Sequence, residues 1–177
     1  DKRRTEIIDA EIDVIKALGV EIKCGIEVGK DVSIDELKAQ GFKAFYVAIG
    51  CQGGRALGVS GEDAANIENA VDFLHKASED HSRVLNGNVV VVGGGNVAID
   101  CSRTAIRFGA KSVKMFALET RETMPAGKDE VAEALDDNVE INNAFGPKEI
   151  IKNDDGSVKA IVFKKCLSTI DAEGKFN

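Results

Sequence analysis

The sequence lacks the features that mark membrane, secreted and nucleic-acid-binding proteins. No apolar run approaches the ~20 residues that a helix needs to span a bilayer, and no signal peptide is recognisable. The 30 acidic side chains outnumber the 23 basic ones, giving a formal net charge of −7, and no basic patch is interleaved with aromatic residues. We therefore expect a cytoplasmic protein that binds neither membranes nor nucleic acid.

Patterns for metal binding and for side-chain catalysis are also missing from the sequence. The cysteines form no C-x-x-C pair, so we expect no zinc site, no iron–sulfur site and no disulfide framework. The two histidines, His75 and His81, lie in one polar stretch and are predicted to be solvated. We expect neither a metal ligand nor a catalytic side chain in this chain.

The most informative segment that is present runs from Asn88 to Asp100 and reads N-V-V-V-V-G-G-G-N-V-A-I-D. Four consecutive valines are typical of a strand that is buried on both faces of a parallel sheet. The run from Asn96 to Phe108 has apolar residues at helical spacing. A strand, a glycine turn and a helix in this order predict the beginning of a βαβ unit.

The glycines match the dinucleotide-binding fingerprint in its G-x-G-x-x-A form. Gly93 permits a tight turn, Gly95 lets the backbone approach a pyrophosphate, and Ala98 is small enough for the helix to pack on the strand. Gly94 and Val97 belong to the same predicted cofactor-binding segment. The unpaired N–H groups at the helix N-terminus would face the phosphates.

The residues that follow the helix strengthen this interpretation. Gly109 is a helix stop, and Ser112–Leu118 is predicted to be a second strand. Glu119 ends that strand, 21 residues beyond Ala98, close to the place where a carboxylate binds the adenosine ribose. An ordinary turn between a strand and a helix is the alternative.

The remaining segments predict an α/β protein with a Rossmann-like parallel sheet, flanking helices and an additional β-hairpin. Before the fingerprint we expect two helices, two strands (residues 20–24 and 44–49), a crossover connection over residues 51–68 and a further helix. After it we expect an acidic helix, a third strand and a hairpin over residues 148–165. The chain begins without methionine, and both ends look cut, so we expect a fragment of a longer protein.

Several ordered motifs resemble the glutamate synthase small chain and related flavin oxidoreductases. They include V-V-V-V-G-G-G-N-V-A-I-D, R-T-A-I-R-F-G-A-K-S-V, the M-P-A at Met124–Ala126 and the terminal C-L-S-T-I-D-A-E-G-K-F-N. The resemblance implies a two-dinucleotide-binding flavoprotein built like thioredoxin reductase. It implies that residues 1–50 are the trailing part of an FAD-domain segment and that residues 69–177 are the inserted NAD(P)H-binding domain.

The resemblance also implies cofactors and partners. FAD would be bound only in the intact parent protein, because the family's FAD fingerprint and iron–sulfur cysteines lie upstream of Asp1. The implied partners are the FAD domain of the same chain and an iron–sulfur or glutamate synthase large subunit. Electrons would pass from NAD(P)H to FAD and on to iron–sulfur clusters, so the fragment alone would be inactive.

Two residues of the predicted helix have candidate roles toward the cofactor. The Asn96 side chain lies at the first turn, where an amide can cap the helix and touch phosphate; a cap alone is the alternative. Asp100 lies one turn further on the same face. The resemblance implies that its carboxylate holds the nicotinamide carboxamide, whereas a helix-dipole partner is the alternative.

The choice between NAD and NADP depends on the end of the second strand. NADP-using relatives resemble Y-R-R there, whereas this chain has Ala117, Leu118 and Glu119. A carboxylate accepts hydrogen bonds from ribose hydroxyls but repels a 2′-phosphate, which favours NAD. Arg121 is close enough to reach such a phosphate, so NADP stays open.

The sequence therefore predicts the nucleotide-binding part of an FAD-dependent oxidoreductase. Two alternatives are an S-adenosylmethionine-dependent methyltransferase, which uses a similar glycine turn, and a redox-sensing module that binds nucleotide without catalysis.

Overall fold

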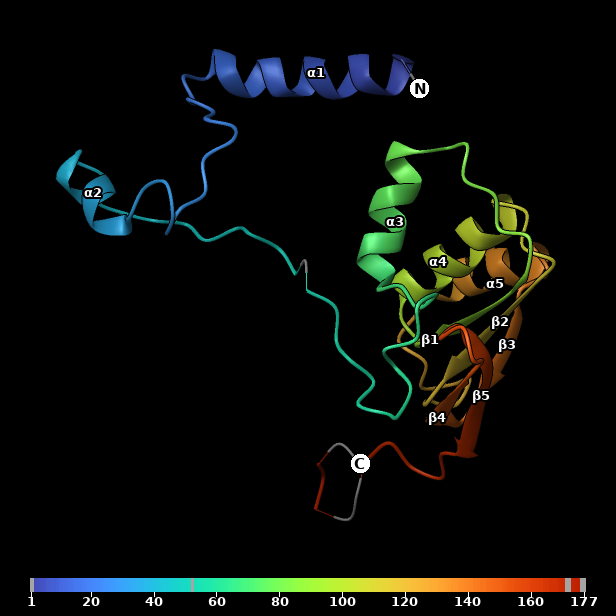
Figure 1. The fold of residues 1–177 in the computed structure, drawn as a ribbon. Coiled ribbons are helices and arrows are strands. Elements are labelled where there is room, and N and C mark those ends of the chain that lie inside the picture. The colour runs from blue at the N-terminus through green and yellow to red at the C-terminus, as the bar shows by residue number, and fades with distance from the viewer. Residues whose placement is uncertain (1, 52, 171–172, 176–177) are drawn as a thin grey trace. The chain divides into compact units, whose positions relative to one another are not determined.

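The computed structural model describes residues 2–51, 53–170 and 173–175 and divides the chain into two compact units. The first unit ends at Ile49, and the second begins at Gly50. Figure 1 shows the elements of each unit. No helix in the described part of the chain is both long enough and apolar enough to cross a membrane.

The first unit contains the two predicted helices. Helix α1 spans Lys2–Ala17 and is followed by Gly19, whose φ of 87° lies in the region that favours glycine. Helix α2 spans Ile34–Ala39 and begins with a capping box, in which Ser33 and Glu36 accept each other's backbone N–H.

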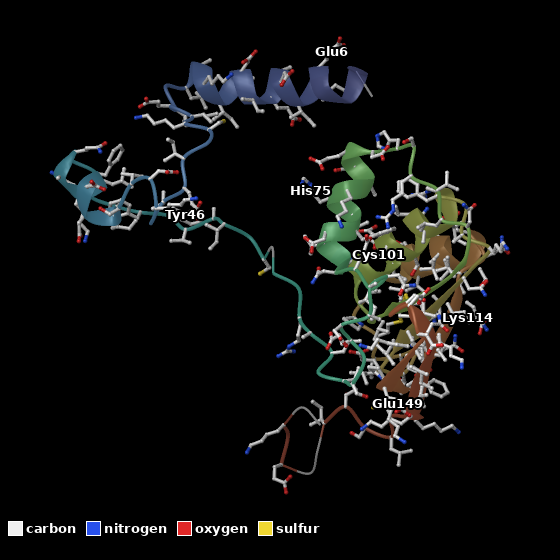
Figure 2. All side chains as sticks on the ribbon, viewed as in Figure 1. Glu6, Tyr46, His75, Cys101, Lys114 and Glu149 are labelled. Atoms are coloured by element: carbon white, nitrogen blue, oxygen red, sulfur yellow. The ribbon has the colours of Figure 1, made fainter. Side chains whose placement is uncertain are left out.

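The two strands predicted in the first unit, at residues 20–24 and 44–49, do not form. Both segments are irregular, and Tyr46 is 94% exposed (Figure 2). An isolated strand leaves its N–H and C=O groups unpaired, and the described residues of this unit offer neither segment a partner strand. The alternation at residues 20–24 and the apolar run at residues 44–49 were therefore insufficient to make strands, and both predictions were wrong.

The second unit is built on a parallel sheet with the order β1-β2-β3. Strand β1 spans Asn88–Val92, β2 spans Ser112–Ala117 and β3 spans Glu140–Asn143. Helices α3 (Ala70–Glu79), α4 (Asn96–Arg107) and α5 (Lys128–Asp136) alternate with them. The predicted βαβ unit, its acidic helix and its third strand are thus confirmed.

The two faces of strand β2 have different partners because successive side chains alternate. Val113, Met115 and Ala117 are at most 1% exposed and belong to the core, which includes Ile99 of α4. Phe116 points to the other side, where its ring stacks on Phe163 with centroids 3.8 Å apart. The helices and the hairpin therefore cover opposite faces of this strand.

The predicted hairpin is formed by β4 (Phe145–Lys152) and β5 (Val158–Lys165), which pair antiparallel. Ala144 joins it to the parallel sheet: its N–H donates to the Glu119 carbonyl at 2.9 Å, and its carbonyl accepts from the Cys166 N–H at 2.8 Å. The main-chain hydrogen bonds of Ala144 therefore connect the segment that follows β2 to the hairpin.

The described residues of the connection ahead of α3 form no helix or strand, but its second half is hydrogen-bonded to the hairpin. Ser60 accepts from the Ile150 N–H at 2.8 Å, and the Ala65 N–H donates to the Gly156 carbonyl at 3.0 Å. Asn66 Oδ1 accepts from the Val158 N–H at 2.7 Å. Residues 60–66 are therefore part of the same packed unit as the hairpin.

Candidate nucleotide-binding site

The site is the turn between β1 and α4, at the carboxyl end of the parallel sheet. The Gly93 N–H donates to the Phe116 carbonyl at 2.9 Å, so the pairing of β1 with β2 reaches into the turn. Gly93 has a φ of +148°, and a Cβ placed there would lie 3.3 Å from the Ala98 Cβ. A tight turn and close strand–helix packing therefore require small residues at both positions.

Gly95 is the N-cap residue of α4 and faces open space. Its φ of −95° and ψ of 175° are extended, and an added Cβ would meet no atom within 4 Å. Its carbonyl accepts from the Ala98 N–H at 3.0 Å, which begins the helix. No described protein atom fills the space next to this residue, so a ligand could occupy it.

The main-chain N–H groups of Gly95, Asn96 and Val97 find no acceptor within the described ranges. These residues line a cavity of about 290 Å³, together with the end of β1 and Ala70 of α3. Unpaired N–H groups and the positive end of the helix dipole make such a place suitable for an anion.

Glu119 lies beside the turn, two residues after the end of β2. The residue is half-buried, and its carbonyl accepts from the Ala144 N–H at 2.9 Å and from Asn143 Nδ2 at 3.2 Å. A Cβ placed on Gly94 would lie 2.5 Å from Glu119 Oε2. The structure therefore brings this carboxylate onto the glycine turn, as the spacing of 21 residues predicts.

The structure corrects the predicted cap by Asn96. Gly95 is the N-cap, and no side chain of the described residues makes a capping hydrogen bond to α4. Asn96 Oδ1 instead accepts from the Gly127 N–H at 2.8 Å, and Nδ2 donates to Glu130 Oε1 at 3.4 Å. The Asn96 side-chain oxygen therefore accepts from Gly127, which is distant in the sequence, and not from an N–H group in the first turn of its own helix.

Asp100 and Arg121 are both exposed. Asp100 lies one turn beyond Asn96 on α4, next to Cys101. Burial, and secondarily the Asp100 charge, raise the pKa of the Cys101 thiol to about 12. This thiol stays protonated at neutral pH and is not a nucleophile.

Sequence reasoning missed several contributors to the site, namely Ala70 in the cavity wall and Gly127 and Glu130 beside the turn. Glu130 lies three residues after Gly127, the N-cap of α5. An acidic residue at this spacing is half of a capping box and is the signal that could have found it. Among the described residues, no group of three or more histidine, cysteine or acidic side chains is placed to hold a metal ion.

Comparison with known proteins supports a nucleotide-binding role. The family model described as "Pyridine nucleotide-disulphide oxidoreductase" matches residues 3–176. The chain is 34% identical over 173 residues to the NADPH-Fe(3+) oxidoreductase subunit beta of Geobacter sulfurreducens, covering 96% of this chain and 26% of that protein. It is 29% identical over 186 residues to the glutamate synthase [NADPH] small chain of Escherichia coli, covering 98% and 39%.

A solved structure shares the fold. The Mycobacterium tuberculosis protein FprA, in complex with NADPH, matches with a TM-score of 0.60 at 18% identity, over 79% of this chain and 46% of that one. The chain thus spans about a quarter to two fifths of the length of these curated relatives. The predicted two-dinucleotide flavoprotein type of fold is confirmed.

Proposed function

Because the chain belongs to the pyridine nucleotide-disulphide oxidoreductase family, we propose that it binds the nicotinamide nucleotide of an FAD-dependent oxidoreductase. In this proposal residues 69–177 form the NAD(P)H-binding domain and residues 51–68 the connection to it. Residues 1–50 are the trailing part of an FAD-domain segment. The resemblance to the glutamate synthase small chain supports this division.

The observation that carries the proposal is the set of unpaired N–H groups at Gly95, Asn96 and Val97, which border a cavity at the N-terminus of α4. A diphosphate would complete their hydrogen bonds, and the open space over Gly95 would admit it. Gly93, Gly94 and Ala98 keep the turn compact. When bound, the reduced nicotinamide supplies a hydride, and this chain contributes orientation and affinity.

We further propose that NADH binds more tightly than NADPH. Glu119 lies at the ribose end of the site, and its carboxylate would accept hydrogen bonds from ribose hydroxyls while repelling a 2′-phosphate. The two curated relatives named above carry NADPH in their names, so this chain would differ from them. Arg121, exposed two residues further, is the group that could favour NADPH.

FAD and the electron acceptor belong to the parent protein in this proposal. The part of the chain that the structure describes has one glycine turn that opens a helix after a strand, and this turn is assigned to the nicotinamide nucleotide. The names of the relatives, subunit beta and small chain, support a protein that works with other subunits. An iron–sulfur or glutamate synthase large subunit is the proposed partner.

A single substitution in the open space over Gly95 tests the site. In Gly95→Val the backbone angles suit any residue, and the new side chain meets no protein atom at Cβ, so the fold should be retained while the diphosphate is excluded. We expect calorimetry to detect NADH or NADPH binding to the wild-type chain and none to this variant. Gly87→Val is the matched control, because Gly87 also faces open space but lies before the opposite end of β1.

Three outcomes would contradict the proposal. One is a wild-type chain that binds S-adenosylmethionine in preference to both nicotinamide nucleotides, which would indicate a methyltransferase. Another is Gly95→Val that binds the nucleotides as tightly as the wild type. The third is an intact flavoprotein whose flavin is not reduced by NADH or NADPH under anaerobic conditions, which would indicate a sensor without catalysis.

A further inference from the structure

The glycine turn is held from one side by residues 124–127, which we call the clamp loop. The Ala126 N–H donates to the Gly94 carbonyl at 3.0 Å, and the Gly127 N–H donates to Asn96 Oδ1 at 2.8 Å. Met124 and Ala126 are each only 9% exposed and belong to the core cluster. The clamp loop is therefore fixed by packing, and its two hydrogen bonds hold the turn in position.

The bond to the Gly94 carbonyl has a consequence for the next N–H group. In a trans peptide the C=O and the following N–H point in opposite directions, and no peptide bond of the described structure is cis. Holding the Gly94 carbonyl toward Ala126 therefore turns the Gly95 N–H away from the clamp loop. This N–H is one of those without an acceptor at the cavity.

Asn96 ties the clamp loop to the first turn of α4. Its Oδ1 accepts from Gly127, and its Nδ2 donates to Glu130 Oε1 at 3.4 Å, so the amide is held at both ends. Gly127 is the N-cap of α5 and Glu130 lies in the first turn of that helix. The Asn96 side chain thus links the N-termini of two helices and makes no capping bond to its own.

The Glu130 carboxylate is held in this arrangement at an energetic cost. Its Oε2 is buried and has no hydrogen-bond partner among the described residues. An unpaired buried carboxylate oxygen is unfavourable, although the N-terminus of α5 partly offsets this through its dipole. The Glu130 carboxylate accepts a hydrogen bond from Asn96 Nδ2, and its buried position fixes the orientation of the Asn96 amide.

We propose that the Asn96 side chain positions the phosphate-binding turn, acting through Gly127 and Glu130, and that this side chain, unlike the main-chain N–H of the same residue, is not a ligand of the diphosphate. The inference rests on the proposed function, because it assigns a role within that same site. Asn96 and the clamp loop set the direction of the turn's N–H groups before the nucleotide arrives.

The test exchanges the donor and the acceptor of the Asn96–Glu130 bond. In Asn96→Asp alone two carboxylates face each other, whereas in the double variant Asn96→Asp/Glu130→Gln the new amide donates to the new carboxylate, which still accepts from the Gly127 N–H. Asn96→Ala removes both side-chain hydrogen bonds, and Asn96→Asp removes the one to Glu130. We expect NADH affinity to fall about tenfold or more in each variant. The double variant should return to within about threefold of the wild type.

A ligand role for Asn96 predicts the opposite order. A carboxylate that touches the diphosphate repels it, so the double variant would then bind NADH more weakly than Asn96→Ala, and that result would overturn the inference. Asn88→Ala is the control: it also removes an asparagine hydrogen bond, to Ser112, at the far end of β1. If Asn96→Ala does not fold, the comparison of Asn96→Asp with the double variant decides the same question.

The two proposals fail in different ways. A wild-type chain that binds neither NADH nor NADPH contradicts the proposed function. A wild-type chain that binds one of them, with every Asn96 variant equal to it, contradicts only the positioning role.

Discussion

The Glu119 carboxylate lies so close to Gly94 that a methyl group on Gly94 would come within 2.5 Å of Oε2. Gly94 is the middle glycine of the turn and is not one of the special positions of the fingerprint. Its φ does not lie in the region that L side chains avoid. A side chain at this position would push the end of Glu119 aside, so the place of the carboxylate that we propose to bind the ribose depends on Gly94.

Gly94→Ala should change the cofactor preference. The new Cβ displaces the flexible end of Glu119 and also lies 3.1 Å from the buried Ala117 Cβ. We expect NADH affinity to fall about tenfold, as when one charged hydrogen-bond acceptor is lost, while NADPH affinity falls less. Calorimetric titration with both nucleotides measures the ratio, with Gly87→Ala as the control in open space. Equal losses for both would mean that the turn itself is distorted.

Glu119→Arg should reverse the preference between the two nucleotides. The substitution removes the acceptor for the ribose hydroxyls and supplies a donor for the 2′-phosphate. We expect NADPH to bind at least about tenfold more tightly than NADH, a difference of about 1.4 kcal/mol. Glu122→Arg makes the same change of charge on the exposed loop nearby and should leave the order unchanged. Tighter NADPH binding by the wild-type chain would refute the assignment of Glu119.

Asp100→Ala should weaken binding of the nicotinamide end of the nucleotide without affecting binding of the ADP-ribose end. The proposed role is toward the nicotinamide carboxamide, so NADH affinity should fall several-fold, by about 1 kcal/mol for one hydrogen bond, while ADP-ribose affinity is unchanged. Asp136→Ala on α5 is the control for loss of an exposed carboxylate. An equal loss for ADP-ribose would point to a structural role of Asp100 in the helix.

The contact between α4 and α5 should make stability depend on pH. The Arg103 guanidinium binds Asp137 at 2.7 Å and also contacts Glu133. The hydrogen bond from Arg103 lowers the pKa of Asp137 below its usual value. A lowered folded-state pKa means that the stabilisation is present above about pH 4, the ordinary range of an aspartate, and is lost as the pH falls through the folded value.

Urea unfolding of the wild type and of Arg103→Gln tests this dependence. The wild type should have the higher midpoint at pH 7, and the difference should shrink steadily between about pH 4 and pH 2. A difference that stays constant over this range would mean that Arg103 stabilises the protein by packing and not by its charge.

The four cysteines should differ in reactivity. Cys101 is 5% exposed, its Sγ donates to the Ala70 carbonyl at 3.6 Å, and its pKa is raised to about 12 (Figure 2). Cys24 and Cys51 are exposed. A short pulse of iodoacetamide at pH 8, read by mass spectrometry, should label these two and leave Cys101 at least about tenfold less modified, because only the thiolate reacts. Equal labelling of Cys101 in the native protein would contradict its burial.

The sequence predicts those parts of the fold that depend on neighbours close in the chain. Valines before three glycines, a small residue at position 98 and a helix stop at Gly109 lie within about twenty residues, and the structure forms the strand, turn and helix that they indicate. The capping box of Ser33 and Glu36 is predicted for the same reason.

Features that depend on distant partners could not be predicted in this way. Residues 20–24 and 44–49 have strand patterns, but a strand needs hydrogen bonds from another strand, which the pattern does not specify. Asn96 occupies a position that suits a cap, yet its acceptor is used by Gly127, 31 residues away. Local preference thus gives way wherever a long-range contact satisfies the same polar group.

The hairpin turn has a practical consequence for engineering this protein. Tips of β-hairpins are usually the first choice for an inserted epitope or a fused reporter, because little else touches them. Here the Gly156 carbonyl is occupied by Ala65 and the Val158 N–H by Asn66. An insertion at residues 153–157 would therefore detach the segment leading into α3, and tags are better placed elsewhere.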